Sequence, residues 1–413
     1  MSPSRNTVRD LRRLNRQRVL RQIYFDAPIS RLDVSRRLGL SPATVTSVVA
    51  ELLSEGLVVE SGSEESDGGR PRTLLTINPD YGFIVGVDFG ETRVQLEIFD
   101  LMLHKLHDTY RPVNPTSAQP HEVVQQIDEG LEELITQTRV DLAQIIGVGL
   151  GNPGIVDIAN EVLVFAPNWG WHQIPLQKML AARLRLPIYL DNGVKAMAQA
   201  EQWFGAGQDV DDLVVLMVGT GVGASIITGR QLYRGATNSA GEWGHTSIDR
   251  NGRLCRCGSH GCLEAYVGAT GIIQRLREYA PDSPLLVNDD RVVTIAAIFD
   301  AARHGDPAAG SVLQETVEYL GMGIANLINL FNPQRILLGG WVGLHFDAPL
   351  LAQVSEVTAQ YALSQPFLGT TIAACKLGQD ALCMGAATLV LDAFLASAGQ
   401  MRRSTFRPVG ALL

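Results

Sequence analysis

The stretch FIVGVDFGETRVQLEIFD, residues 83–100, contains two apolar strands joined by a turn with a glycine. A second stretch of the same plan, DLVVLMVGTGVGASIITG, occupies residues 212–229. Such turns expose backbone N–H groups that can hold phosphates, although one glycine-containing hairpin is weak evidence by itself. Two copies, each opening a segment of alternating strands and helices, predict an internally duplicated fold with a cleft between two lobes.

The rest of the chain alternates between strand-like and helical runs. The strand-like runs lie at 145–150, 187–190 and 335–338, and the helical runs at about 121–137, 194–204, 265–279, 308–331 and 380–396. This alternation indicates an α/β body with a mixed sheet in each lobe. A chain of 413 residues is too long for one core. We expect a head over 1–79, a first lobe over 80–200 plus about 380–413, and a second lobe over 201–379. The last helix is expected to cross back onto the first lobe.

The N-terminal segment carries the helix signals of a winged helix-turn-helix. Ser30, with Asp33 three residues later, is typical of a capping box, and Gly39 ends that helix. Ser41 can cap a second helix with Pro42 at its first position. The apolar stripe of this second helix consists of Val45, Val48, Val49, Leu52 and Leu53. A helix at about 8–25 is expected to pack across the pair.

The opposite face of the second helix carries small residues that can approach base edges: Ala43, Thr44 and Ser47. Two apolar strands, 57–60 and 73–77, then flank a glycine-rich tip, and this predicts a β-hairpin wing. Arg70 and Arg72 are placed to enter a minor groove or to hold phosphates. The net charge is −9, yet residues 1–37 carry ten arginines against three aspartates. A basic helix that is only solvated would have the same charge. The basic segment together with the helix-turn-helix and the wing nevertheless favours double-stranded DNA as a partner.

Three of the five cysteines lie within eight residues, at Cys255, Cys257 and Cys262. In a chain without a secretory signal, such clustering indicates a metal site rather than disulfides. Together with His245 or His260 they form the ligand set of structural zinc, which leaves no position for a catalytic water. The loop is polar and rich in glycine, so it cannot build a core of its own. Three buried free thiols are the alternative.

The two glycine turns at 88–93 and 219–223, AGEWGH at 240–245 and CRCGSHGCLE at 255–264 resemble the ROK family of sugar-responsive repressors and sugar kinases. The likeness covers nearly the whole chain, and the last two motifs are highly specific. It implies two actin-like, ribonuclease-H-like lobes, a place in the repressor branch, and His245 as the fourth metal ligand. Carried over residue by residue, the sugar-binding positions are Asn168, Asn192, Glu242, His245 and Glu264. Trp169, Trp171 and Trp243 are candidates either for stacking on the sugar or for the core.

A kinase of this family needs an aspartate as general base, in the pattern Glu-Asn-Asp-Ala-Asn at the end of a strand. Aligned on Ala200 and Glu201, the stretch PIYLDNGVKAMAQAEQWFG (187–205) places Gly193 at that aspartate. A register shifted by two would put Asp191 there, but it breaks the match to the following helix. Glu91 also replaces a glycine of the first phosphate turn, and its charge opposes a triphosphate. The resemblance therefore predicts a protein that is not an enzyme.

These features predict a sugar-responsive DNA-binding regulator, a repressor whose operator binding is modulated by a small neutral sugar in an inactive kinase-like cleft. A homodimer or tetramer would place two heads on a two-fold operator. The alternatives are a ROK sugar kinase with an added DNA-binding domain, and a repressor controlled by a phosphosugar or a protein partner. The first residues lack the apolar part of a signal peptide, and no apolar run approaches the ~18–20 residues that cross a bilayer. We therefore expect a cytoplasmic, nucleoid-associated protein with no membrane partner.

Overall fold

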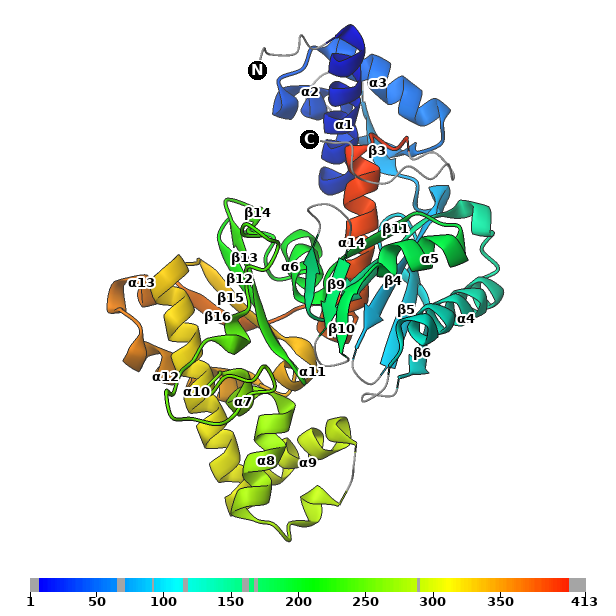
Figure 1. The fold of residues 1–413 in the computed structure, drawn as a ribbon. Coiled ribbons are helices and arrows are strands. Elements are labelled where there is room, and N and C mark those ends of the chain that lie inside the picture. The colour runs from blue at the N-terminus through cyan, green and yellow to red at the C-terminus, as the bar shows by residue number, and fades with distance from the viewer. Residues whose placement is uncertain are drawn as a thin grey trace.

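The computed structural model describes residues 7–64, 71–90, 93–113, 118–157, 163–166, 170–287 and 290–400. A small head lies above a body of two lobes, as Figure 1 shows. The C-terminal helix α14 (Ala381–Ala396) runs from the head to the junction of the two lobes. The chain therefore returns at its C-terminal end to the first lobe, as the sequence predicted, and also to the head, which the sequence did not predict.

The head contains three helices and a small sheet of strand order β1–β3–β2. Its elements are α1 (Val8–Asp26), β1 (Ile29–Ser30), α2 (Arg31–Leu38), α3 (Pro42–Ser54), β2 (Val58–Glu64) and β3 (Arg72–Ile77). The predicted caps form, because Ser30 Oγ accepts from the Asp33 N–H and Ser41 Oγ from the Thr44 N–H. Gly39 closes α2 at a φ of +64°, a conformation that favours glycine. The helix-turn-helix and its wing are confirmed.

The first lobe is built on a five-stranded sheet of order β11–β7–β4–β5–β6. Its strands are β4 (Phe83–Phe89), β5 (Arg93–Phe99), β6 (Lys105–Pro112), β7 (Ile145–Asn152) and β11 (Ile188–Asn192). Strands β11, β7 and β4 are parallel, whereas β4, β5 and β6 are antiparallel. Apolar residues of two helices pack on this sheet, α4 (Pro120–Thr138) and α5 (Leu176–Leu184). The lobe is completed by η1 (Pro79–Tyr81), η2 (Leu142–Gln144) and a sheet of β8 (Ile155–Asp157), β9 (Leu163–Ala166) and β10 (Trp171–Ile174).

The second lobe repeats this plan with the strand order β14–β13–β12–β15–β16. Its strands are β12 (Leu213–Val218), β13 (Val222–Thr228), β14 (Gln231–Leu232), β15 (Arg335–Gly339) and β16 (Thr371–Ala374). Strands β16, β15 and β12 are parallel, and β12, β13 and β14 are antiparallel, so the two sheets correspond strand for strand. The duplication read from residues 83–100 and 212–229 is therefore confirmed.

The helices of the second lobe surround its sheet and extend below it, where α8 and α9 form the lower end of the molecule (Figure 1). They are η4 (Trp243–His245), α7 (Glu264–Val267), α8 (Ala269–Tyr279), η5 (Pro284–Leu286), α9 (Arg291–Arg303), α10 (Pro307–Phe331), α11 (Gly340–Gly343), α12 (Ala348–Tyr361), α13 (Ser364–Leu368) and η6 (Gly378–Asp380). One further helix, α6 (Gly193–Phe204), connects the last strand of the first lobe to the second lobe.

Helix α14 packs directly on the first-lobe sheet, with Gly86 of β4 and Gly149 of β7 beneath it. A Cβ atom at Gly86 would overlap the carbonyl oxygen of Cys383, and one at Gly149 would overlap that of Ala386. Residues 378–396 are long and apolar enough to cross a membrane by composition, which was not expected from the sequence. Most residues of α14 are apolar because the helix packs against the sheet, α6 and the head, whereas the exposed Asp392 pairs with Arg21.

Candidate functional site: the cleft between the lobes

A cleft of about 860 Å³ lies between the two lobes and is lined by residues from both. The first lobe contributes the ends of β4, β7 and β11, and the second lobe contributes the Gly219–Gly223 turn and the segment around Glu242. Asn192, Glu242, His245 and Glu264 line it, although Asn192 and Glu264 lie 72 positions apart in the chain. Asn168 lies outside the described residues. The duplicated fold therefore brings four of the five predicted sugar-binding positions to one site.

Asn192 has a structural role that its sequence position did not reveal. Its side-chain oxygen accepts from the N–H groups of Val194 and Lys195, at 2.9 and 3.3 Å, and so caps α6. Its amide nitrogen donates to the carbonyl oxygen of Gly154 at 2.7 Å. One amide hydrogen remains for a ligand. Asn192 is thus both part of the cleft wall and the start of α6.

Glu264 is held in place by the glycine turn and by an arginine. Its Oε2 accepts from the Val222 N–H at 2.9 Å, and its Oε1 lies 3.4 Å from Nη2 of Arg256. Arg256 also donates to the carbonyl oxygen of Thr220 at 3.3 Å. Arg256 was not predicted from the sequence as a residue of the cleft. Its place between Cys255 and Cys257, two of the predicted metal ligands, was the signal that could have indicated it. The cleft therefore contains an arginine whose charge faces a carboxylate.

Two further carboxyl groups of the cleft have raised pKa values. Burial raises the pKa of Asp88 to about 6, and the nearby Arg93 opposes this effect. Burial also raises the pKa of Glu242, against the charges of His245 and Lys195. Carboxyl groups at the wall of a cleft can form hydrogen bonds with the hydroxyl groups of a ligand.

The tryptophans divide between the core and the cleft. Trp171 is buried and donates to the Ala118 carbonyl oxygen, and Trp243 is buried and donates to that of Gly323. Both are core residues, while Trp169 lies outside the described residues. Trp341, in α11 directly after β15, lines the cleft instead. The sequence offered no signal for this residue, because its position depends on the packing of α11 against the Gly219 turn.

His245, Cys255, Cys257 and Cys262 form a cluster whose potential ligand atoms all lie within 4.8 Å of one another. The Cys257 and Cys262 sulfur atoms are 3.7 Å apart, and Cys255 Sγ is 3.8 Å from His245 Nδ1. A tetrahedral site with Zn–S bonds of about 2.3 Å has ligand separations of about 3.8 Å. The four residues therefore fit a metal ion of this geometry, and His260 is not among them.

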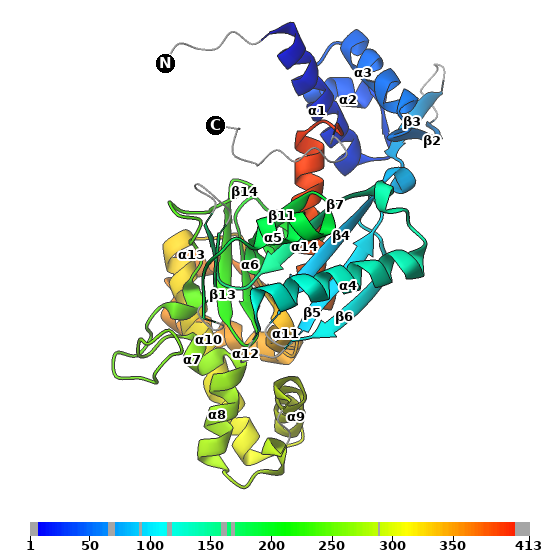
Figure 2. The same cartoon turned by 45° about the vertical axis from the view of Figure 1, so that its right-hand side comes forward.

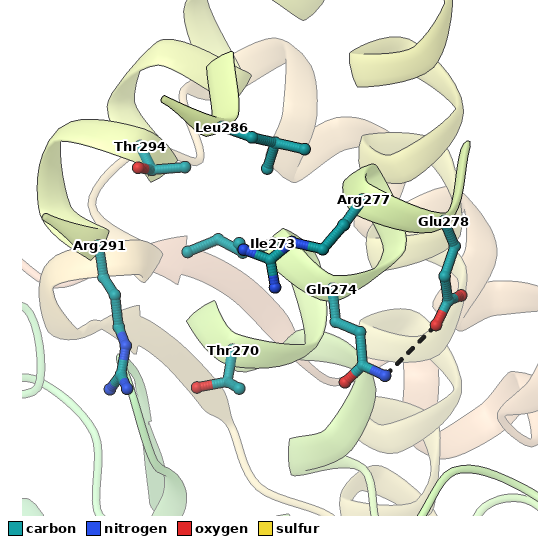
Figure 3. Close-up of a pocket in the computed structure, with 8 residues that line it drawn as sticks. All are labelled: Thr270, Ile273, Gln274, Arg277, Glu278, Leu286, Arg291 and Thr294. Atoms are coloured by element: carbon teal, nitrogen blue, oxygen red, sulfur yellow. Dashed lines mark hydrogen bonds between the residues drawn. The ribbon is translucent and has the colours of Figure 1, made fainter. Parts of the chain in front are cut away.

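A second hollow of about 460 Å³ lies between α8, η5 and α9 (Figure 3). Arg277 and Arg291 come from its opposite walls, and Gln274 bonds to Glu278 at its rim. Glu278, which also lines the hollow, accepts from Arg253 at 2.6 and 2.8 Å. None of the residues predicted from the sequence lines this hollow. The cleft between the lobes is therefore the candidate ligand site.

The structure describes all three residues of α3 that were predicted to approach DNA. Ala43 and Ser47 are exposed, whereas Thr44 is half-buried and its hydroxyl lies 2.8 Å from that of Ser41. Thr46, which the sequence did not single out, is also exposed and lies beside Ala43 and Ser47 on the helix. In the wing, Arg72 is half-buried at the start of β3, and Arg70 lies outside the described residues.

Comparison with known proteins agrees with this architecture. The model of the ROK family matches residues 84–393, and a winged helix-turn-helix DNA-binding model matches residues 12–59. The chain belongs to the ROK family. It is 31% identical to the xylose repressor of Caldicellulosiruptor bescii, over 93% of this chain and 97% of that protein. The match therefore includes both the head and the ROK body.

Two solved ROK structures show the same folds. One is a ROK family transcriptional regulator, a homologue of the E. coli MLC protein, with a TM-score of 0.79 and 27% identity. It covers 94% of this chain and 98% of its own length. The other, a ROK glucokinase from Streptomyces griseus in complex with glucose and AMPPNP, has a TM-score of 0.66 and 31% identity over 75% of this chain and 99% of its own. The actin-like lobes are thus confirmed.

Gly193, which the family resemblance predicted to stand in place of the kinase aspartate, lines the cleft. A Cβ atom there would meet only ordinary contacts, of which the nearest is Leu382 Cδ2 at 3.5 Å. The fold therefore does not require glycine at this position. Asp191, the other carboxylate of the stretch, is buried and does not line the cleft, because it pairs with Arg234 at 2.5 Å.

Proposed function

We propose that this protein is a sugar-responsive transcriptional repressor, in which a sugar bound between the ROK lobes modulates the binding of the head to operator DNA. The observation that carries the proposal is the pairing of a winged helix-turn-helix with a ROK body and its cleft. The alignment by which we place Gly193 at the position of the base supports it. The xylose repressor and the ROK transcriptional regulator, which match over almost their whole length, support this reading over that of a kinase.

The charge of the cleft supports a neutral sugar as effector. The described residues that line it include the carboxyl groups of Asp88, Asp157, Glu242 and Glu264 and a single arginine. The guanidinium of this arginine, Arg256, already faces Glu264. A phosphosugar would bring a dianion to a site that is rich in carboxylates, at an electrostatic cost. We assign sugar contacts to Asn168, Asn192, Glu242, His245 and Glu264, by analogy with the ROK pattern.

The remaining parts of the proposal concern the metal, the assembly and the DNA. We assign the Cys3His cluster to structural zinc, held by His245, Cys255, Cys257 and Cys262. Because His245 and Glu264 border both the loop and the cleft, the metal would orient sugar-binding groups.

A homodimer or tetramer would place two copies of the α3 face on a two-fold operator, with Arg70 and Arg72 at the DNA backbone or minor groove. We place the head at 1–79, the lobes at 80–200 with 380–413 and at 201–379, and the protein in the cytoplasm at the nucleoid.

The proposal is tested by screening the purified protein against a panel of neutral sugars and their phosphates in a thermal-shift assay. A ligand that binds the native state raises its apparent stability, by about 2.7 kcal/mol at a hundredfold excess over Kd. DNA binding is then measured with the protein's own promoter region, with and without each sugar that raises the melting temperature. We expect a neutral sugar to change DNA affinity at least tenfold. Equal DNA affinity with every stabilising sugar would contradict the proposal.

We also expect no ATP-dependent phosphorylation of any sugar that binds. The position of the general base carries no carboxylate, and general-base catalysis is worth about 10²–10⁴-fold in rate. The measurement is a coupled assay for ADP release, with a ROK glucokinase as positive control. Turnover by the unaltered chain at a rate typical of a kinase would replace the repressor proposal with the kinase alternative.

A further inference from the structure

Helix α6 begins at the cleft and ends at the head. Asn192, its N-cap, and Gly193 and Val194, its first residues, all line the cleft. Its last residues, Trp203 and Phe204, lie against α1 of the head. Twelve residues of helix span about 18 Å. A rigid element thus connects the candidate sugar site with the DNA-binding domain.

The contact between α6 and the head is a cluster of aromatic rings. The ring of Phe25 lies 5.2 Å from that of Trp203, edge to face, and 6.3 Å from that of Phe204. The guanidinium of Arg21 lies 5.1 Å from the rings of both Phe25 and Trp203. Tyr24 adds a contact to Phe204 at 6.5 Å. These distances are typical of favourable aromatic and cation–π pairs.

The head is attached to the body a second time, through α14. Leu382, near the start of α14, lines the cleft, and Phe394 and Leu395, near its end, belong to the same apolar core as the head residue Leu20. Arg16 of α1 donates to the carbonyl oxygen of Ala398 at 2.9 Å. This attachment is a shared core, so the head and α14 are expected to move together.

The two helices differ in their attachment: α14 is packed on the first lobe, whereas α6, which continues from β11 of the first lobe, is also bonded to the second. Helix α14 lies directly on the first-lobe sheet at Gly86 and Gly149. Helix α6 is hydrogen-bonded to the second lobe at both of its ends. Lys195 donates to the carbonyl oxygen of Asn238, and the fully buried Glu201 accepts from the Leu377 N–H at 2.9 Å.

A rotation of one lobe against the other must therefore slide α6 along α14. The two helices are in close contact, because a Cβ atom at Gly385 would lie 2.5 Å from the carbonyl carbon of Ala196. Packed helices accommodate such changes by small shear movements between discrete arrangements. We propose that α6 is the element that transmits sugar binding to the head. In this proposal α6 shears against α14, and the contact of α6 with the ring of Phe25 converts that movement into a tilt of the DNA-binding domain.

This inference rests on the proposed function, and Phe25→Ala tests it. Phe25 is 37% exposed, so its truncation removes the contact with α6 without opening a core cavity. We expect Phe25→Ala to bind the sugar as the unaltered protein does, while the sugar-induced change in DNA affinity falls to less than twofold. Tyr110→Ala, which truncates a 63% exposed ring on β6, is the matched control and should keep the full response. A full sugar response in Phe25→Ala would overturn the inference.

A second measurement separates this inference from the repressor proposal. Hydrogen exchange of the α1 amides around Phe25 is compared with and without the stabilising sugar, in the absence of DNA. We expect a sugar-dependent change in exchange that Phe25→Ala removes and Tyr110→Ala retains. If DNA affinity never responds to sugar but this change is present, the repressor proposal fails and the coupling stands. If α1 exchange is the same with and without sugar, the coupling is wrong even where DNA binding responds.

Discussion

Cys257→Ser is expected to release the bound metal and to weaken sugar binding by at least a hundredfold. The Cys257 thiol is exposed, so the substitution itself costs little packing. Three remaining ligands cannot close a tetrahedral thiolate site, and structural zinc sites contribute about 10–16 kcal/mol of binding free energy in small zinc-dependent domains. Without the metal, the polar loop 250–262 has no core to hold it, and His245 and Glu264 lose their fixed positions at the cleft.

The measurements are metal content per chain, by elemental analysis, and the thermal shift with the stabilising sugar. His260→Ala is the matched control, because His260 lies in the same loop but outside the cluster of potential ligand atoms. It should keep both the metal and the sugar response. Metal content near one per chain in Cys257→Ser, or its loss in His260→Ala, would show that the ligand assignment is wrong. Retained sugar binding in metal-free protein would contradict the orienting role of the metal.

Ala43→Glu is expected to lower operator affinity by at least a hundredfold while sugar binding is unchanged. Ala43 is exposed in the first turn of α3, directly after Pro42. A carboxylate in the first turn is favourable for the helix itself, so the head should remain folded. On DNA, the same carboxylate would face phosphates and base edges with no compensating cation, and like charges held this close repel strongly.

Ala348→Glu provides the control for this prediction. Ala348 is an exposed alanine in the first turn of α12, a helix of similar length in the second lobe. It receives the same charge far from the head and should bind the operator as the unaltered protein does. DNA affinity is measured by fluorescence anisotropy at a fixed salt concentration, since binding to phosphates depends steeply on salt. Equal operator affinity for Ala43→Glu and Ala348→Glu would show that α3 is not part of the DNA interface.

Much of the architecture was predictable because its signals are local. The caps at Ser30 and Ser41 and the stop at Gly39 each depend on a few neighbouring residues, so they mark the helix-turn-helix in any context. The two glycine-containing strand pairs likewise predicted two lobes with corresponding sheets. The ligand set of the metal cluster was predictable for the same reason, except that sequence alone left His245 and His260 as equal choices until the family resemblance was considered.

The site itself was only partly predictable. The family pattern named Glu242, His245 and Glu264, but it could not show that the side chain of Asn192 caps α6. Periodicity also could not separate core tryptophans from Trp341, which lines the cleft. On α3, the exposure of Thr46 beside Ala43 and Ser47 was not singled out from the sequence, and the DNA contact of Thr44 stays a prediction.

The sequence by itself determined the order of the elements, the duplicated plan, the cluster of three cysteines and the glycine at position 193. Each of these depends only on one short segment or on a motif with fixed spacing. The tertiary structure alone decided that α6 joins the cleft to the head, that α14 shares its core with α1, and that Arg256 faces Glu264. The physical reason is that these contacts join segments far apart in the chain, and side-chain packing between such segments leaves no periodic pattern in either one.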